Sequence, residues 1–414
     1  MSEKFDALIA NKMSSAQYML DEITHICKDM PKRDPGSDGE RIASEYMAEV
    51  LKNDCGCEKV DIESFDENPG SFYGWIHITF TLCFIALILI PLCPGSVAAA
   101  IIGVLCILLG WVLALLQFGL YKKVVDFMFP KKVGTNVTAI KSCTGEVKRR
   151  IFFNGHQDAA WEWPANFLGG GVLFEGLIII AAIGTLYYLG LDISIIVAGT
   201  LTATAKKMAY IGLIFVPFWI YMFFMWNRNR IVDGANDNLS GCYMGIAILK
   251  AMKEAGIELE NTEVGVILSG SEEAGLRGSK AWCEAHKGEF QDVPTFIYSY
   301  DTIHDPKYLL TNYRDLNATV KADKDVSDLF MEAAQELNIQ CKKGMVPPLG
   351  GATDNAAFAQ GGFRSTGITG LNHNLENYYH TRRDSYDNMD LQGLADCYAV
   401  SVKVLDMFDQ GAKQ

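Results

Sequence analysis

Four long apolar runs constrain the fold of this chain more than any other feature of its 414 residues. Trp75–Cys93, Val97–Leu120 and Met208–Trp226 contain no Asp, Glu, Lys or Arg, and Val172–Leu191 contains only Glu175. A membrane core of about 30 Å is crossed by roughly 20 helical residues, so each run is long enough to span it. The alternative is buried core helices, but such helices seldom lack charge over these lengths. We therefore expect four transmembrane helices.

The runs divide a soluble α/β sequence into three pieces. Residues 1–72, 122–166 and 228–414 are expected to form one domain, and 73–121 and 167–227 are expected to form two transmembrane hairpins. Pro94-Gly95-Ser96 predicts a tight turn in the first hairpin. We expect the chain to be a multi-pass membrane protein that has the lipid bilayer as a partner.

Basic residues near the runs predict the orientation of the chain in the membrane. Hairpins leave and re-enter the bilayer on one side, so the soluble pieces share a face. The cations expected on this face are Lys122, Lys123, Lys131, Lys132, Arg228 and Arg230, with Lys206 and Lys207 in the opposite loop. The positive-inside rule then favours a cytoplasmic soluble domain. Eleven cysteines without a CxxC pair agree with a reducing compartment.

Strands alternate with helices in the soluble pieces. Short β-type segments at 136–140, 150–154, 263–268 and 295–300 are followed by helical periodicity, for example over Ser240–Ala255. This order predicts an α/β fold with a mainly parallel or mixed sheet covered by helices on both faces.

Histidine and carboxylate side chains stand at or near the predicted strand ends. The candidate ligands are His156, Asp237, Glu273, Asp301 and His380. Zinc accepts neutral imidazole and carboxylate oxygens. Because the carboxyl ends of parallel strands meet at one edge of a sheet, these side chains are expected to lie close together. They are the residue types that a pair of zinc ions requires, one carboxylate serving as a bridge.

Two more carboxylates accompany the candidate ligands. Glu272, directly before Glu273, is the candidate general acid and base, since hydrolysis needs a carboxylate to move a proton from water to the leaving amine. Asp158, two residues after His156, is a candidate supporting residue for that imidazole. The net charge of −13 leaves no basic surplus to neutralise phosphates, which argues against a nucleic-acid partner.

The chain resembles the M28 family of zinc aminopeptidases and related peptidases. The motifs that carry the resemblance are Gly155-His156-Gln157-Asp158, Gly234–Gly241, Ser271–Ser279, Tyr300-Asp301 and Tyr379–Asp384. The resemblance covers most of 20–72, 133–160 and 230–410, and the four apolar runs lie outside it. It implies a zinc-exopeptidase-like fold and hydrolysis of a peptide bond, with an aminopeptidase expected.

The resemblance also implies a role for each site residue. His156 and Asp301 would bind one zinc ion, Glu273 and His380 the other, and Asp237 would bridge them, giving two ions per chain. Three further residues are candidates for handling substrate. Gly350–Asn355, which contains Asp354, resembles the glycine-rich segment before the last ligand, and Tyr378 or Tyr379 would stabilise an oxyanion or pack beside His380.

Two alternatives follow from the same motifs. A membrane receptor or adaptor on a peptidase fold would have lost metal ligands, and none is lost in this chain. A glutaminyl-cyclase-like acyl transferase is the second alternative, and the intact set for two metals argues against it. A peptide is the expected substrate, and the sequence specifies no oligomeric state.

Overall fold

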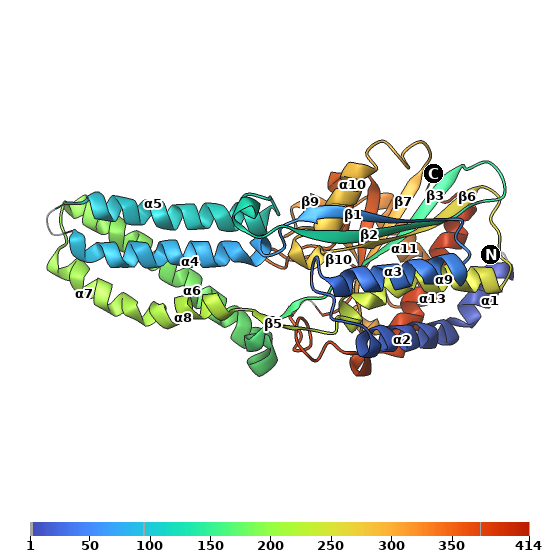
Figure 1. Cartoon of the computed structure of the whole chain (residues 1–414), viewed down its shortest axis with the longest axis horizontal. Coiled ribbons are helices and arrows are strands. Elements are labelled where there is room, and N and C mark those ends of the chain that lie inside the picture. The colour runs from blue at the N-terminus through green and yellow to red at the C-terminus, as the bar shows by residue number, and fades with distance from the viewer. Residues whose placement is uncertain (1–2, 94–95, 373, 414) are drawn as a thin grey trace. The chain divides into compact units, whose positions relative to one another are not determined.

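The computed structural model describes residues 3–93, 96–372 and 374–413 (Figure 1). The chain forms two compact units. One, here the sheet unit, comprises Met1–Pro69, Lys131–Trp161 and Arg230–Gln414. The other, the helical unit, comprises Gly70–Pro130 and Glu162–Asn229. The short strands β4 (Trp161–Glu162) and β5 (Asn227–Ile231) occur in the sequence where the chain passes between the units.

A nine-stranded sheet forms the centre of the sheet unit, in the order β1-β2-β6-β3-β7-β11-β8-β10 with β9 paired to β8. The strands are β1 (Lys59–Glu67), β2 (Lys132–Lys141), β3 (Arg149–His156), β6 (Thr262–Ser269), β7 (Thr295–Ile303), β8 (Leu310–Asp315), β9 (Val320–Lys321), β10 (Lys342–Met345) and β11 (Arg364–Gly370). Strands β6, β3, β7 and β11 are parallel, whereas β1, β2 and β8 join antiparallel neighbours. The predicted α/β fold with a mixed sheet is confirmed.

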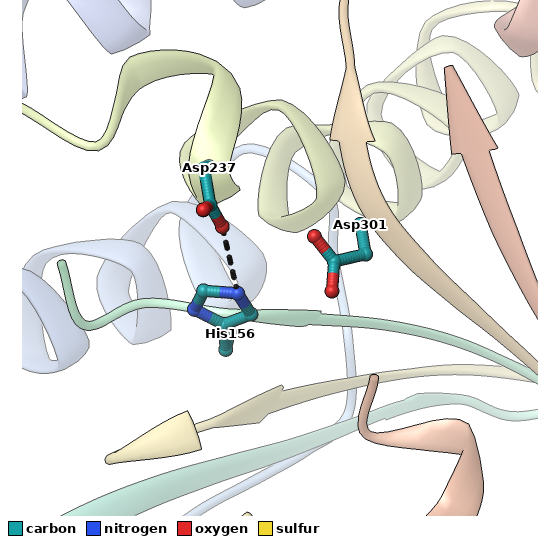
Figure 2. A group of neighbouring side chains, drawn as sticks. All are labelled: His156, Asp237 and Asp301. Carbon is teal, nitrogen blue, oxygen red and sulfur yellow. Dashed lines mark ion pairs between the residues drawn. The ribbon is translucent and has the colours of Figure 1, made fainter. Parts of the chain in front are cut away.

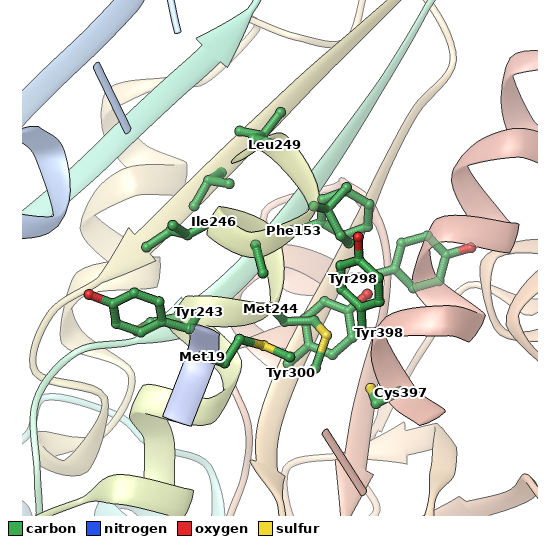
Figure 3. Packing of buried hydrophobic residues seen from close by; sticks show 14 of the residues in the cluster. Met19, Phe153, Tyr243, Met244, Ile246, Leu249, Tyr298, Tyr300, Cys397 and Tyr398 are labelled. Atoms are coloured by element: carbon green, nitrogen blue, oxygen red, sulfur yellow. The ribbon is translucent and has the colours of Figure 1, made fainter. Parts of the chain in front are cut away.

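Helices cover both faces of this sheet. They are α1 (Glu3–Ala10), α2 (Lys12–Asp29), α3 (Asp38–Asn53), α9 (Ser240–Glu254), α10 (Arg277–Ala285), α11 (Lys324–Glu336), α12 (Asn355–Gln360) and α13 (Leu391–Asp409). Successive side chains of a strand point to opposite faces. Accordingly, Ile151 and Phe153 of β3 lie in one apolar core, and Phe152 between them lies in the other. The larger core gathers side chains of α2, α9, β7 and α13 around Phe153 (Figure 3).

One close approach brings α9 to the end of β3. A Cβ atom on Gly155 would lie 2.3 Å from the backbone nitrogen of Cys242 in α9. Only glycine leaves room for this contact, which places the start of α9 beside the last residues of β3. The Cys242 thiol donates to the His156 carbonyl oxygen at 3.1 Å.

The start of α3 is capped, but by a different arrangement from a standard capping box. Ser37 Oγ accepts from Glu40 N at 3.1 Å, as in a capping box. Glu40 accepts from the backbone nitrogen of Gly36 at 3.0 Å instead of returning to Ser37. Its other oxygen accepts from Thr135 N of β2 at 2.9 Å, so a tertiary contact draws the side chain inward.

The helical unit contains four helices that are long and apolar enough to cross a membrane by length and composition. These candidate spans are Ser71–Leu92, Ala98–Gly119, Pro164–Ala198 and Ala203–Phe224. They comprise α4 (Ser71–Leu89), α5 (Ala98–Leu113), α6 (Pro164–Ala198), α7 (Ala203–Gly212) and α8 (Val216–Tyr221), with short 3₁₀ or π turns at the ends of α4, α5, α7 and α8. Pro94 and Gly95, where a tight turn is predicted, lie outside the described residues.

Two of the candidate spans are interrupted. Gly170 has φ +66° within α6, so a short helical segment precedes the long one. The fourth span changes to a 3₁₀ turn at Leu213–Phe215, directly before Pro217. Proline lacks the N–H that would continue the helical ladder, which accounts for the break at this residue.

Candidate metal centre

His156 is the last residue of β3 and is 1% exposed. Strand β3 lies between β6 and β7 and is parallel to both, so the carboxyl ends of all three strands meet at one edge. Strand β7 carries Asp301 at this edge. Figure 2 shows the side chains of Asp237 and Asp301 directed toward the His156 ring.

Asp237 lies in the irregular turn η6 (Ala235–Leu239), directly before α9. Asp384 fixes this turn, because its carboxylate accepts from the backbone nitrogens of Asn236 at 2.8 Å and Asp237 at 3.2 Å. The neighbouring Asn238 donates to the Tyr300 carbonyl oxygen at 2.7 Å, which ties the turn to β7. These bonds hold the Asp237 carboxylate between the ends of β3 and β7.

Asp237 connects two groups of potential ligands. Its Oδ1 lies 3.2 Å from His156 Nε2, and its Oδ2 lies 3.1 Å from His380 Nε2. His380 Nε2 also lies 3.1 Å from Glu273 Oε1. Ligand atoms of His156, Asp237 and Asp301 all lie within 4.8 Å of one another, and those of Asp237, Glu273 and His380 do the same. The structure brings all five predicted ligands together, in two triads that share Asp237.

The turn that follows β6 carries Glu272 and Glu273. The Asp158 carboxylate accepts from the backbone nitrogens of Glu272 at 2.9 Å and Glu273 at 3.0 Å. Asp158 Oδ1 is 3.5 Å from His156 Nδ1, longer than a normal hydrogen bond. The main contact of Asp158 is therefore with this turn, and its expected support of the imidazole is the weaker contact. Glu272 Oε2 lies 4.0 Å from His156 Nε2, close to the first triad.

The site concentrates acidic groups away from water. Burial raises the pKa of Glu272 well above its usual range, and it raises that of Asp301 to about 8. Burial opposes ionisation of Asp237 too, but the adjacent imidazoles of His156 and His380 lower its pKa below the usual value. Burial disfavours a charged His380, yet the neighbouring Glu273 and Asp237 raise its pKa to about 10.

These residues fit a bound cation. Each of the five candidate ligands is at most 8% exposed, and a buried carboxylate is costly unless it is paired or coordinates a metal. The donor set of two imidazoles and three carboxylates matches the ligands that zinc takes in proteins. His156 Nδ1 and Nε2 and Asp237 Oδ2 make no hydrogen bond with well-formed geometry among the described residues. The unprotonated nitrogen of a neutral His156 and the free oxygen of Asp237 are suited to a metal.

The three candidate substrate residues differ in their surroundings. Asp354 is buried and accepts from the Ser269 hydroxyl. The Tyr379 ring stacks on that of His380, with ring centroids 4.2 Å apart. The Tyr378 ring packs against His304 at 4.6 Å, and its buried hydroxyl makes no hydrogen bond within the described part of the chain. Of the two expected roles, Tyr379 therefore packs beside His380. The hydroxyl of Tyr378 is available to hydrogen-bond another group.

Arg33 is a site residue that the sequence reasoning missed. Its guanidinium is buried and donates to three carbonyl oxygens, those of Gln157 at 2.8 Å, Asp233 at 2.7 Å and Gly234 at 3.1 Å. It therefore joins the segment after His156 to the segment before Asp237. Asp384 is also a residue whose role was missed, although it lies within a recognised motif. Neither contact has a signature in local sequence.

Comparison with known proteins agrees with this geometry. Residues 223–405 match the model of Peptidase family M28. This segment includes Asp237, Glu273, Asp301 and His380, and His156 precedes it. No curated protein sequence matches the chain. The predicted resemblance to M28 zinc peptidases is confirmed.

Solved structures with the same fold come from zinc exopeptidases and a related enzyme. The chain is similar to an aminopeptidase from Aneurinibacillus sp. strain AM-1, with TM-score 0.56 and 13% identity over 96% of this chain and 95% of that one. A zinc aminopeptidase from Bacillus subtilis gives TM-score 0.54 and 11% identity over 94% of each chain. Glutaminyl cyclase from Porphyromonas gingivalis gives TM-score 0.54 and 11% identity, with 96% and 98% covered.

At these identities the neighbours define the fold, which is that of the zinc exopeptidases. The family match, the donor set and the zinc aminopeptidase neighbours together support zinc as the metal. The sheet unit has a zinc-exopeptidase fold, and residues 223–405 of the chain match the M28 family model. The four apolar helices of the helical unit are consistent with spans inserted into that fold.

Proposed function

We propose that this protein is a membrane-embedded zinc aminopeptidase. The observation that carries the proposal is that two triads of potential ligands share Asp237. Its Oδ1 lies beside His156, which forms the first triad with Asp301, and its Oδ2 lies beside His380, which forms the second triad with Glu273. When bound, two zinc ions would polarise the attacking water and the scissile carbonyl, one ion held by His156, Asp237 and Asp301 and the other by Asp237, Glu273 and His380.

Glu272 is the residue proposed to move the proton. Its carboxyl lies beside the first triad without being part of either triad. As the carboxylate, it accepts a proton from the attacking water and delivers it to the nitrogen of the leaving amine. The new C–O bond forms first and leaves an oxyanion on the former carbonyl. The C–N bond then breaks as the amine nitrogen takes up the proton, and the products are a carboxylate and an amine.

Asp158 and Tyr378 are proposed to assist in different ways. Asp158 orients Glu272 and Glu273 by accepting from both of their backbone nitrogens. Tyr378 would donate its hydroxyl proton in a hydrogen bond to the oxyanion that develops on the substrate carbonyl. Asp354, whose Oδ1 makes no hydrogen bond among the described residues, would accept from a donor group of the substrate.

A peptide with a free N-terminus is the proposed substrate. The support comes from the neighbours, two of which are aminopeptidases by name. The four candidate spans support integration in a lipid bilayer. The cations beside the runs support a cytoplasmic location for the sheet unit, by the positive-inside rule.

Cleavage of a peptide library by the purified full chain tests the proposal. We expect release of N-terminal residues, loss of this activity in Glu272→Gln by about 10²–10⁴-fold, and unchanged activity in Glu284→Gln, an exposed glutamate on α10. Equal activity of Glu272→Gln and the native chain would remove Glu272 as the base. Cyclisation of N-terminal glutamine without peptide cleavage would establish the acyl-transferase alternative instead.

A further inference from the structure

Two buried glutamates flank the residue directly before Glu272. Glu40 of α3 is 0% exposed, and Glu67 at the end of β1 is 3% exposed. The Ser271 hydroxyl oxygen lies 2.8 Å from Glu40 Oε2 and 2.6 Å from Glu67 Oε1. Both distances are those of O–H···O hydrogen bonds. Elements far apart in the sequence thus meet at a single hydroxyl.

Counting protons assigns a role to each carboxyl group. A serine hydroxyl has one proton to donate and accepts at its oxygen, so it cannot donate to both glutamates at once. Glu40 already accepts from two backbone nitrogens, those of Gly36 at 3.0 Å and Thr135 at 2.9 Å. Two backbone donors favour the carboxylate form at Glu40, so we assign Ser271 as a donor to it. The contact with Glu67 then places the proton on Glu67, which donates to Ser271.

The backbone at Ser271 explains why such an anchor is needed. Ser271 has φ +54°, a left-handed conformation that costs a non-glycine residue roughly 1 kcal/mol. The next two backbone nitrogens then point at Asp158. If Ser271 returned to ordinary backbone angles, Glu272 and Glu273 would leave the positions that face His156 and His380.

We propose that Glu40 and Glu67 share one proton through Ser271 and that this chain of hydrogen bonds positions the turn carrying Glu272 and Glu273. The three residues act through the turn and touch neither substrate nor metal. The inference deepens the proposed function and rests on it where catalysis is concerned. The hydrogen-bonded chain itself is a property of the fold.

The charges around Glu67 agree with a retained proton. Burial raises the pKa of Glu67 to about 7 and Asp158 also raises it, while the hydrogen bond with Ser271 and the charges of Arg277 and Lys132 lower it. Burial raises the pKa of Glu40 as well, and its hydrogen bonds with Gly36 and Ser271 oppose that shift. Ionising Glu67 would place a second buried charge beside the Glu40 carboxylate. Because the folded-state pKa is raised, the anchor is complete below about pH 7 and weakens as the pH rises through this value.

Infrared difference spectroscopy tests the proton without any assay of activity. At pH 6, subtracting the spectrum of Glu67→Gln from that of the native full chain should leave the C=O stretch of a protonated carboxylic acid. Subtracting that of Glu63→Gln, on the same strand but hydrogen-bonded to His286, should leave no such band. A carboxylate difference in place of the acid band for Glu67→Gln would overturn the proposal.

Substitutions test the positioning role through an expected asymmetry. In the native chain, kcat should fall as the pH rises through the pKa of Glu67. Glutamine at 67 can still donate to Ser271 and does not ionise, so in Glu67→Gln this fall of kcat should shift to higher pH. Glutamine at 40 has only one acceptor oxygen, so one of the three contacts of Glu40 is lost in Glu40→Gln. We expect kcat to fall about 10- to 100-fold with KM nearly unchanged, which corresponds to one unsatisfied buried group. Equal kcat losses and equal pH profiles for the two variants would refute the proposal. An inactive native chain that keeps the infrared band would refute the proposed function alone.

Discussion

The sheet unit and the helical unit use apolar side chains in opposite ways. In the sheet unit, consecutive apolar residues of β3 are buried in two cores, one on each face of the sheet. In the helical unit, large apolar side chains point outward: Leu105 is 60% exposed and Val197 is 83% exposed. Water penalises such a surface, whereas hydrocarbon does not. The same residue types therefore stabilise one unit by packing within the protein and give the other an outward apolar surface of the kind that suits hydrocarbon.

Polar groups differ between the units as well. The sheet unit buries a connected set of carboxylates, histidines and Arg33 at one edge of its sheet. The four candidate spans have polar contacts that are mostly single hydrogen bonds between helices, such as Thr79 to the Gly110 carbonyl oxygen at 3.2 Å. The sheet unit therefore concentrates buried polar groups, whereas the candidate spans of the helical unit present apolar side chains outward.

Matched truncations of apolar side chains should give the largest difference between the units. Phe153→Ala removes a 1%-exposed ring from the core of the sheet unit, and we expect a loss of about 3–5 kcal/mol in its free energy of unfolding. Leu105→Ala should change that free energy by less than about 0.5 kcal/mol, because the side chain is outward-facing. Denaturant unfolding in detergent, followed by near-UV circular dichroism, measures both. Equal losses for the two variants would contradict the difference in burial between the two units.

A charge on the outward face tests for lipid directly. Leu105→Arg should reduce membrane insertion, since arginine near the middle of a span costs about 2.5–3.5 kcal/mol on insertion scales. Ile62→Arg, on the exposed side of β1, is the control and should insert normally. The carbonate-resistant fraction of each variant in isolated membranes is the measurement. Full resistance of Leu105→Arg would show that α5 does not face lipid.

Removal of Arg33 tests the polar side of the comparison. Arg33→Met leaves the carbonyl oxygens of Gln157, Asp233 and Gly234 without this donor, so the segments that bear His156 and Asp237 lose their connection. We expect zinc affinity to fall about 10- to 100-fold, as is usual when a residue supporting metal ligands is lost. Competition with a chromogenic chelator measures it. Affinity equal to that of the native chain would show that the ligands hold their places without Arg33.

Helix caps should give the smallest effects. Ser37→Ala removes the acceptor for Glu40 N and should destabilise the sheet unit by about 1 kcal/mol. Thr202→Ala removes the corresponding acceptor for Ala205 N at the start of α7 in the helical unit. It should leave the unfolding of the sheet unit unchanged. A loss in the sheet unit from Thr202→Ala would show that the two units do not unfold independently.

Much of the fold followed from local patterns. Alternation and helical periodicity predicted β3, β6, β7 and α9 to within a few residues of their observed bounds. Strand-end chemistry accounts for His156, Glu273 and Asp301, because ligands at the carboxyl edge follow from parallel pairing, whereas Asp237 and His380 lie outside the strands and were found by the family motifs. Length and absence of charge located the four apolar helices.

What the sequence did not reveal depends on contacts between distant segments. Arg33 donates to carbonyl oxygens more than 100 residues away, and carbonyl acceptors leave no trace in residue type. Glu40 looked like a local capping residue, but its bonds to Thr135 and Ser271 form only in the folded sheet unit. The break at Gly170 was also missed, since glycine is common in membrane helices and rarely marks a change of direction there.

The most direct test of the central claim is the zinc content of the purified full-length protein. The shared position of Asp237 between two triads predicts about two zinc ions per chain by elemental analysis, and fewer in Asp237→Asn. Glu272→Gln should keep the native content, because Glu272 belongs to neither triad. Protein that is folded and free of zinc after purification and incubation with the metal would contradict the account.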